Sequence, residues 1–191
     1  MILQEADMLS QAETQQFEKA YREYESGDRH KAVQELRSLI ETSLDPTDQM
    51  GLLYHEVLWL MELSAISNAR DRLNEFRKLL ESFADAPIDQ DYLTPQATRT
   101  VMACFVEAKL LLAEGNRAEA VASLDDIVSR FPKQLMNFPE IHDHVQLTRG
   151  YFSGEPGQWK KAITILESLS PAAEETSFVS YSLGHSWDEH R

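Results

Sequence analysis

The feature that most restricts the fold of this chain is a helical hairpin pattern that recurs along the sequence. In its first copy, an apolar stripe that includes Ala20 ends at Gly27-Asp28, and a second stripe carries Ala32 and Leu36. Apolar residues in both segments recur at spacings of three and four, which is the period of an amphipathic helix. No stretch alternates polar and apolar residues over the length that a half-buried strand needs. The pattern therefore predicts an all-α chain of antiparallel helical hairpins.

Two later segments repeat this pattern. Residues 20–40 align with residues 108–128 without a gap, and Gly115 and Gly157 occupy the place that Gly27 has in the first copy. Glycine at this place frees the backbone to adopt the left-handed conformation that ends a helix. The polar residue after each glycine can accept hydrogen bonds from the first amides of the next helix. Each of these turns therefore predicts two antiparallel helices.

A degenerate hairpin lies between the first two copies. It is predicted as helices at about 49–63 and 68–83, and its turn at 64–68 contains no glycine. We therefore expect about four hairpins within one domain, 1–191, at residues 3–44, 48–84, 94–132 and 138–170. An array of this kind needs a helix to cover its last hairpin, so residues 171–191 are predicted as a capping helix and tail. The acidic stretch 81–93 is predicted as an exposed connector.

These hairpins resemble the tetratricopeptide repeat, whose unit is a helix, a tight turn and a second helix. The resemblance rests on a small residue in each helix, the turn glycine and a large apolar residue in the return helix. In successive copies these are Ala20, Gly27, Ala32 and Leu36, then Ala108, Gly115, Ala120 and Leu124, then Gly150, Gly157, Ala162 and Leu166. The copies lack the family's first-helix tryptophan and are unevenly spaced. The resemblance thus implies a short α-solenoid of stacked hairpins with irregular curvature.

The resemblance also implies a protein-interaction module whose first helices line a concave face that holds a segment of a partner protein. The residues expected on this face are Phe17, Tyr21, Tyr24, Tyr54, Met61, Phe105, Lys109, His144, Leu147 and Tyr151. Aromatic groups with a polar tip suit recognition because they bury a large area at low entropic cost. The alternative for each ring is packing between neighbouring hairpins. The expected role is therefore that of an adaptor or chaperone-like protein. The first hairpin is also similar to the small acidic tetratricopeptide chaperones of bacterial type III secretion, a likeness that the second hairpin does not continue.

Charge restricts the class of partner. The chain has 18 Lys and Arg residues against 32 Asp and Glu residues, which gives a formal net charge of −14. Nucleic acid and anionic membrane surfaces would be repelled, whereas a basic or apolar protein partner is favoured. Of the residues expected on the concave face, only Lys109 suits the acidic carboxyl tails of heat-shock chaperones, which argues against that family subtype. The single cysteine, Cys104, and an opening segment without the basic start of a secretory signal predict a cytoplasmic protein.

No catalytic, metal or cofactor site is predicted. His142 and His144 flank Asp143, but residues two apart on a helix point to nearly opposite sides and cannot chelate one ion. Cys104 is expected to be an inert core thiol, and His55 a polar flank of its helix. The adjacent pair Asp125-Asp126 is expected to be solvated surface. Two alternatives stay open: a small-ligand or metal site around His144, and a self-associating structural protein that buries Trp59 between copies.

Overall fold

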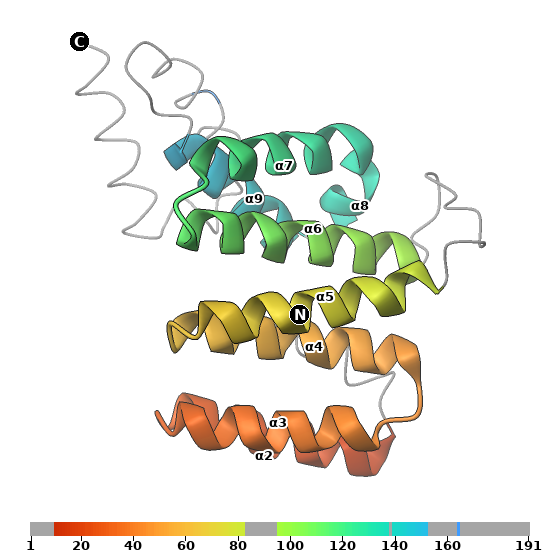
Figure 1. Ribbon diagram of the computed structural model, residues 1–191. Coiled ribbons are helices and arrows are strands. Elements are labelled where there is room, and N and C mark those ends of the chain that lie inside the picture. Colours follow the sequence, from red (N-terminus) through yellow and green to blue (C-terminus); the bar gives the residue numbers. More distant parts are fainter. Residues whose placement is uncertain (1–9, 83–94, 138, 153–163, 165–191) are drawn as a thin grey trace. The chain divides into compact units, whose positions relative to one another are not determined.

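The structure is a computed structural model that describes residues 10–82, 95–137, 139–152 and 164 (Figure 1). Two compact units divide the chain, residues 1–114 and residues 115–191, and each is considered by itself. All regular secondary structure in the described ranges is helical, and its helices pack in adjacent pairs, which confirms the predicted all-α fold. Most of the predicted connector, the second helix of the last hairpin and the capping helix lie outside the described residues. A single domain spanning 1–191 stays a prediction.

The helices have well-defined bounds in both units. The described helices of the first unit are α2 (Gln11–Glu25), α3 (Arg29–Thr42), α4 (Pro46–Glu62), α5 (Ile66–Glu81) and α6 (Pro95–Ala113). Those of the second unit are α7 (Arg117–Arg130), α8 (Pro132–Asn137) and α9 (Pro139–Phe152).

The start of α2 differs from the prediction of a helix that runs from residue 3. The backbone N–H of Glu13 donates to Ser10 Oγ at 3.3 Å, and the backbone N–H of Ser10 donates to the Glu13 carboxylate at 3.0 Å. Ser10 itself has extended backbone angles. This reciprocal capping box begins the helix at Gln11, so the predicted start was wrong. Residues 1–9 lie outside the described part of the chain.

Each described turn between paired helices contains one residue in the left-handed conformation, and this residue is not always glycine. Gly27 and Gly115 have φ values of 95° and 85°, as the turn pattern predicts. In the degenerate hairpin Ser64 takes the left-handed role with φ 59°. Helix α4 begins at Pro46 rather than near residue 49, because the Asp45 carboxylate accepts from the Thr47 backbone N–H at 2.7 Å and proline suits the first helical position.

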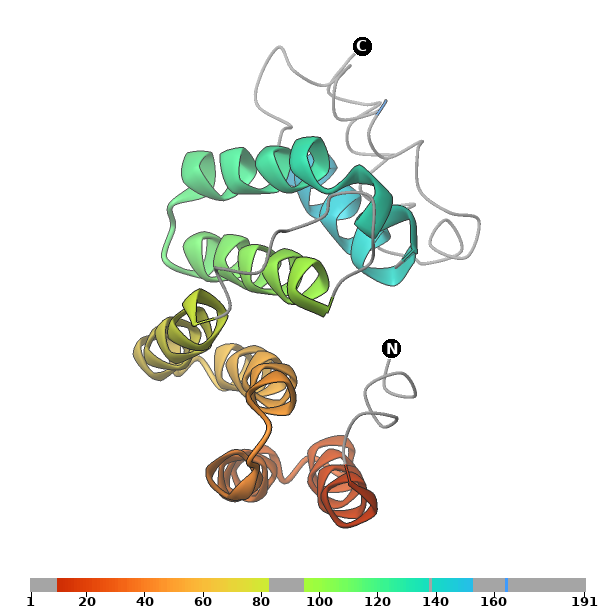
Figure 2. The same cartoon turned by 90° about the vertical axis from the view of Figure 1, so that its right-hand side faces the viewer.

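Within the first unit, each helix packs against its neighbour in the chain or the next helix but one. Helix α2 contacts α3, α4 contacts α3 and α5, and α6 contacts both α4 and α5. Figure 2 shows α2 to α5 nearly end-on as two successive hairpins. Ala20, Ala32 and Ala69 are fully buried where paired helices approach closely, which is the role that the repeat pattern predicts for them.

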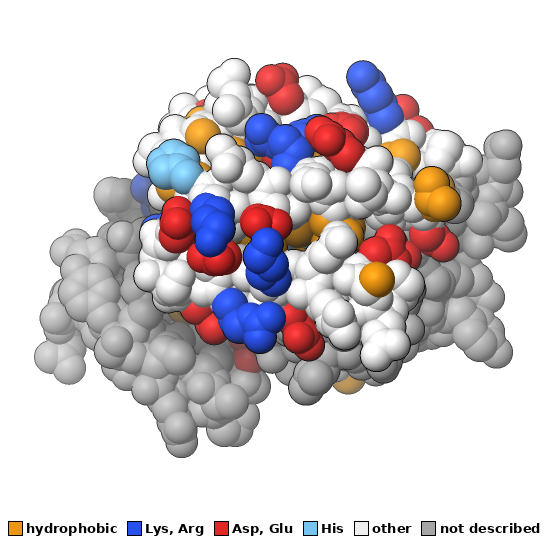
Figure 3. All heavy atoms as spheres, turned by 90° about the horizontal axis from the view of Figure 1, so that it is seen from below, with side chains coloured by type: hydrophobic (Ala, Val, Ile, Leu, Met, Phe, Trp, Pro, Cys, Tyr) orange, Lys and Arg blue, Asp and Glu red, His pale blue; other side chains and the backbone are white. Residues whose placement is uncertain are grey.

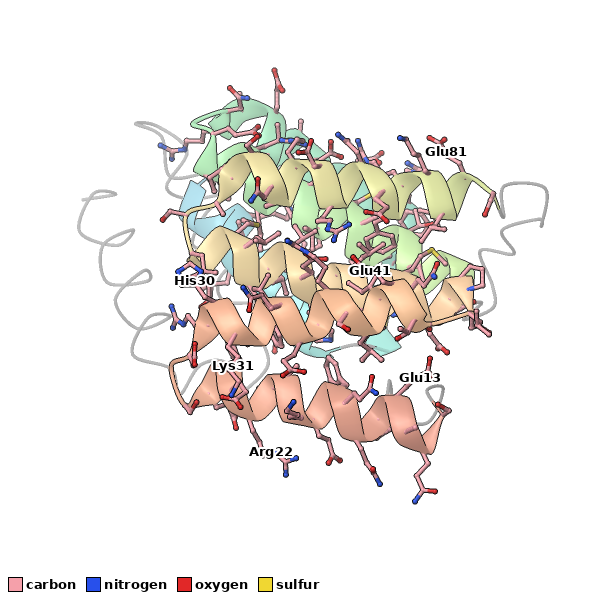
Figure 4. The ribbon with its side chains drawn as sticks, turned by 60° about the horizontal axis from the view of Figure 1, so that its bottom comes forward. Glu13, Arg22, His30, Lys31, Glu41 and Glu81 are labelled. Carbon is pink, nitrogen blue, oxygen red and sulfur yellow. The ribbon has the colours of Figure 1, made fainter. Side chains whose placement is uncertain are left out.

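Ion pairs join the helices of the first unit at their surface. Lys19 of α2 lies 2.7 Å from Glu35 of α3, and Lys31 of α3 pairs with Glu23 of α2. The face seen in Figure 3 carries interleaved basic and acidic side chains. Figure 4 shows Lys31 reaching from α3 toward α2, whereas Arg22 lies on the side of α2 that faces away from α3. Such exposed pairs contribute little to stability, because water and salt screen their attraction.

A second set of pairs links the next helices. Arg70 of α5 lies 2.6 Å from Glu114 and 3.8 Å from Glu107 of α6, and Arg77 of α5 also pairs with Glu107. The Glu56 carboxylate of α4 is fully buried and lies 2.8 Å from Arg37 of α3 and 3.0 Å from Arg72 of α5. Glu56 of α4 thus anchors arginines from both α3 and α5, and Glu107 of α6 anchors two arginines of α5.

The second unit contains a short helix that the sequence pattern does not predict. Helix α8 follows α7 directly, and the backbone N–H of Leu135 donates to the Phe131 carbonyl at 3.0 Å. Phe131 and Leu135 are each 2% exposed, and Val145 of α9 is fully buried. The predicted third hairpin simply ends at residue 132. Proline also suits the first position of a new helix, and that helix forms here because its one apolar turn packs against α9.

Candidate partner-binding surface

An aromatic cluster fills the space between α2 and α4. Tyr24 stacks on Trp59 with ring centroids 4.6 Å apart and an interplanar angle of 11°. Tyr21 lies 6.4 Å from the same Trp59 ring, and Phe17 lies 5.1 Å from the His55 ring. Trp59 and Phe17 are nearly fully buried, whereas Tyr21 and Tyr24 are half-buried. The two tyrosines therefore form the accessible edge of a rigid cluster.

His55 is part of this cluster, and its predicted role as a polar flank was wrong. The side chain is 7% exposed, and its ring lies edge-on to Tyr54 with the centroids 5.4 Å apart. Helix α4 has neighbours on most of its circumference, since it contacts α3, α5 and α6 and meets the rings of α2. A position one residue off the main apolar stripe of α4 is consequently interior.

Glu62, at the end of α4, interacts with side chains of three other helices, α2, α3 and α6, beside the aromatic cluster. Tyr24 of α2 is hydrogen-bonded to Glu62 at the end of α4, and the Arg29 guanidinium lies 3.4 Å from the Glu62 carboxylate. Arg29 also lies over the Tyr24 ring, 5.5 Å from its centroid. Lys109 of α6 lies near enough to Glu62 for their charges to interact. We call Tyr21, Tyr24, Arg29, Glu62 and Lys109 the inner-helix surface.

Two groups of the inner-helix surface have altered proton affinity. Burial and the hydrogen bond to Glu62 raise the pKa of Tyr24 to about 12, which keeps its hydroxyl a neutral donor. Burial lowers the pKa of Lys109, and the Glu62 carboxylate opposes this effect. The Lys109 ammonium lies over the Phe105 ring, 5.4 Å from its centroid. The surface thus presents aromatic rings, a phenol and a partly desolvated ammonium side by side.

The predicted concave-face residues fall into three groups. Phe17, Tyr54 and Phe105 are 2–3% exposed, so they pack between helices in this structure. Tyr21, Tyr24, Met61, Lys109 and Leu147 are half-buried. His144 and Tyr151 belong to α9, but their side chains lie outside the described part of the chain. The structure brings Tyr21, Tyr24 and Lys109 together through Trp59 and Glu62, which the sequence analysis did not assign to this face.

A buried charged pair lies where α4 meets α6. Asp48 and Arg99 are 8% and 5% exposed, and their charges attract. Gly51 leaves room for this arginine, because a Cβ atom at that position would lie 3.0 Å from Arg99 Nη2. Burial, followed by the repulsion of Asp45 and Glu13, raises the pKa of Asp48 to about 6. The ionised form of Asp48 is therefore disfavoured in the folded chain.

Asp48 makes the stability of the fold depend on pH. Its folded pKa of about 6 exceeds the ordinary value of 3.8, so the folded chain is destabilised progressively as the pH rises between these values. We therefore compare the free energy of unfolding of the Asp48→Asn variant with that of the unchanged protein. The difference should shift in favour of the variant by roughly 2 kcal/mol between about pH 4 and about pH 7. Urea titrations at several pH values would measure it. The control is Glu41→Gln, at an exposed position of α3. If the stability difference between Asp48→Asn and the unchanged protein does not change with pH, the prediction is wrong.

One of the other candidate reactive groups has different surroundings from those expected. Cys104 is half-buried rather than fully within the core. Asp125 and Asp126 are 40% and 50% exposed, as a surface pair should be, and Asp125 also lies 2.7 Å from Arg149. Within the described ranges, no group of three or more His, Cys, Asp or Glu side chains is placed to hold a metal ion. Phe17, Glu18, Tyr21 and Arg22 of α2 line part of an open pocket of about 250 Å³.

A family model of the tetratricopeptide repeat matches residues 107–133, which cover the C-terminal end of α6, the turn at Gly115, α7 and the start of α8. The comparisons find no curated protein and no solved structure that matches the chain significantly. Of the described helices, none is long and apolar enough to cross a bilayer. Tetratricopeptide repeats generally form non-catalytic modules for binding other proteins.

Proposed function

Since the chain is a tetratricopeptide-like helical repeat protein, we propose that it is a non-enzymatic adaptor or chaperone-like module that binds a segment of a partner protein. The segment would lie along the first helices of the hairpins, on the concave face of the array. One observation supports this site above others: the first helices α2, α4 and α6 all contribute to the inner-helix surface, together with Arg29 of α3, and their side chains meet at Glu62. Rings already held by Trp59 lose little conformational entropy when a partner covers them.

The partner is proposed to be basic or apolar and to be met in the cytoplasm. The net charge of −14 favours encounter with a basic protein more than it strengthens the final complex. Trp59 is 3% exposed within one chain, so self-association, which is one alternative, would have to use other side chains. A small-ligand site around His144 remains the other alternative, and native mass spectrometry of the purified protein would detect such a ligand.

A pull-down from native lysate with matched variants tests the proposed function. Tyr21→Ala and Lys109→Ala together are expected to reduce recovery of the partner at least tenfold, because both side chains are accessible and neither lies in the centre of the core. Tyr24→Ala is a poorer probe because it would remove the stack on Trp59. Recovered partners would then be titrated as purified segments to measure Kd.

The control for this experiment is Gln34→Ala, an exposed position on α3 away from the inner-helix surface. It should retain the partner, and circular dichroism should show equal helicity for all variants. Full retention of the partner by the Tyr21→Ala, Lys109→Ala protein would exclude this surface as the binding site.

A further inference from the structure

A chain of hydrogen bonds in the second unit runs along α9 and ends on α7. His142 Nδ1 lies 3.2 Å from Asp143 Oδ1, and His142 Nε2 lies 3.2 Å from Gln146 Nε2. Arg149 donates from Nη1 to Gln146 Oε1 at 2.6 Å and from Nε to Asp125 Oδ1 at 2.8 Å. Gln146 is 8% exposed, so its amide depends on these partners rather than on water.

The chemistry of these groups fixes where the imidazole proton lies. A guanidinium group has only donors, so the amide oxygen of Gln146 must face Arg149. The amide nitrogen then faces His142 and donates to Nε2, which therefore carries no proton. The hydrogen of the neutral ring is on Nδ1, where it is donated to Asp143. In this arrangement the neutral ring makes a hydrogen bond at each of its two nitrogens.

We propose that His142, Gln146 and Arg149 form a pH-sensitive latch that holds α9 against α7 while His142 is neutral and loosens when the ring is protonated. A proton on Nε2 would set two donors against each other. Rotating the Gln146 amide would restore that contact but would turn its NH₂ group toward Arg149. Either response leaves one buried donor without an acceptor, which weakens the link to Asp125 on α7.

Among the residues that the structure describes, Asp143, Arg149 and Asp125 are the charged groups of this hydrogen-bond chain. Asp143, on α9 itself, attracts the imidazolium ion, but it already accepts the Nδ1 hydrogen of the neutral ring, so protonation strengthens an existing bond without adding one. Arg149 repels the imidazolium ion, and its charge is balanced by Asp125 of α7. The described side chains of α8, Pro132, Leu135 and Met136, carry no ionisable group.

Hydrogen exchange at two pH values tests the latch in the full-length protein. After correction for the intrinsic exchange rate, amides of residues 139–152 should exchange at least about threefold faster near pH 5.5 than near pH 7.5. His142→Gln should abolish this response because the new side chain does not titrate. Gln146→Glu should reverse it, since a carboxylate accepts hydrogen bonds from both Arg149 and a protonated imidazole.

The matched control is His30→Gln, which removes an exposed histidine of α3 in the other unit and should leave the response intact. An unchanged exchange rate in the starting protein, or a response that survives His142→Gln, would overturn the latch. Any effect on partner binding through Leu147 of α9 rests on the proposed function. The exchange measurement does not, so the two hypotheses can fail separately.

Discussion

Replacing Trp59 with alanine is expected to lower the free energy of unfolding by about 4 kcal/mol. The ring is 3% exposed, stacks on Tyr24 and approaches both Tyr21 and His55. Its removal would leave a cavity between α2 and α4 and would also remove the stacking energy, which adds roughly 1 kcal/mol to the loss of buried area. Urea denaturation followed by circular dichroism would measure the change.

Two further variants separate the packing of Trp59 from the exposed edge of the cluster. Trp59→Phe should cost less than the alanine variant, because a smaller ring can still contact Tyr24. Tyr21→Ala should cost only about 1 kcal/mol, because its ring is half-buried and retains solvent on one side. Equal losses for Trp59→Ala and Tyr21→Ala would show that the cluster is not organised around the tryptophan.

Local signals predicted the helical hairpins well. Gly27 and Gly115 indicated left-handed turns because few other residues adopt positive φ at low cost, and both have it in the structure. Ala20 and Ala32 indicated where two helices approach most closely, because each is a small residue on the apolar stripe of its helix. Both are fully buried. These properties depend on a single hairpin, so the sequence of that hairpin is sufficient to reveal them.

Contacts between hairpins were much harder to predict. The position of His55 depends on how α4 is rotated against α2, and the position of Glu62 depends on both α2 and α6. The sequence of α4 alone does not indicate how this helix is rotated against its neighbours. The left-handed conformation of Ser64 was not predicted for another reason. The two helices that Ser64 connects impose this conformation, and serine has no propensity for it.

Replacing Glu56 with glutamine is expected to lower the free energy of unfolding by about 3 kcal/mol. Glu56 Oε1 accepts from Arg37 Nε at 2.9 Å and from Arg72 Nε at 3.1 Å, and the residue is fully buried. Neutralising the carboxylate would leave two guanidinium groups close together with no negative charge between them. Glu75→Gln is the control, because that carboxylate also pairs with Arg72 but is 46% exposed, and it should cost under about 1 kcal/mol.

We expect Glu56 to contribute to the alignment of α3, α4 and α5 more than to net stability. Combining Glu56→Gln with Arg37→Gln should recover part of the loss, because one of the two opposed cations is then removed, and a double-mutant cycle would give a coupling above about 1 kcal/mol. An apolar triad, Arg37→Met, Glu56→Leu and Arg72→Met, should be about as stable as the unchanged protein, since buried charges are costly to desolvate. Suppose that this apolar variant still unfolds cooperatively but no longer binds the partner. The three charged side chains then set the register of α3, α4 and α5. If Glu56→Gln alone costs nothing, the carboxylate is not the link between these helices.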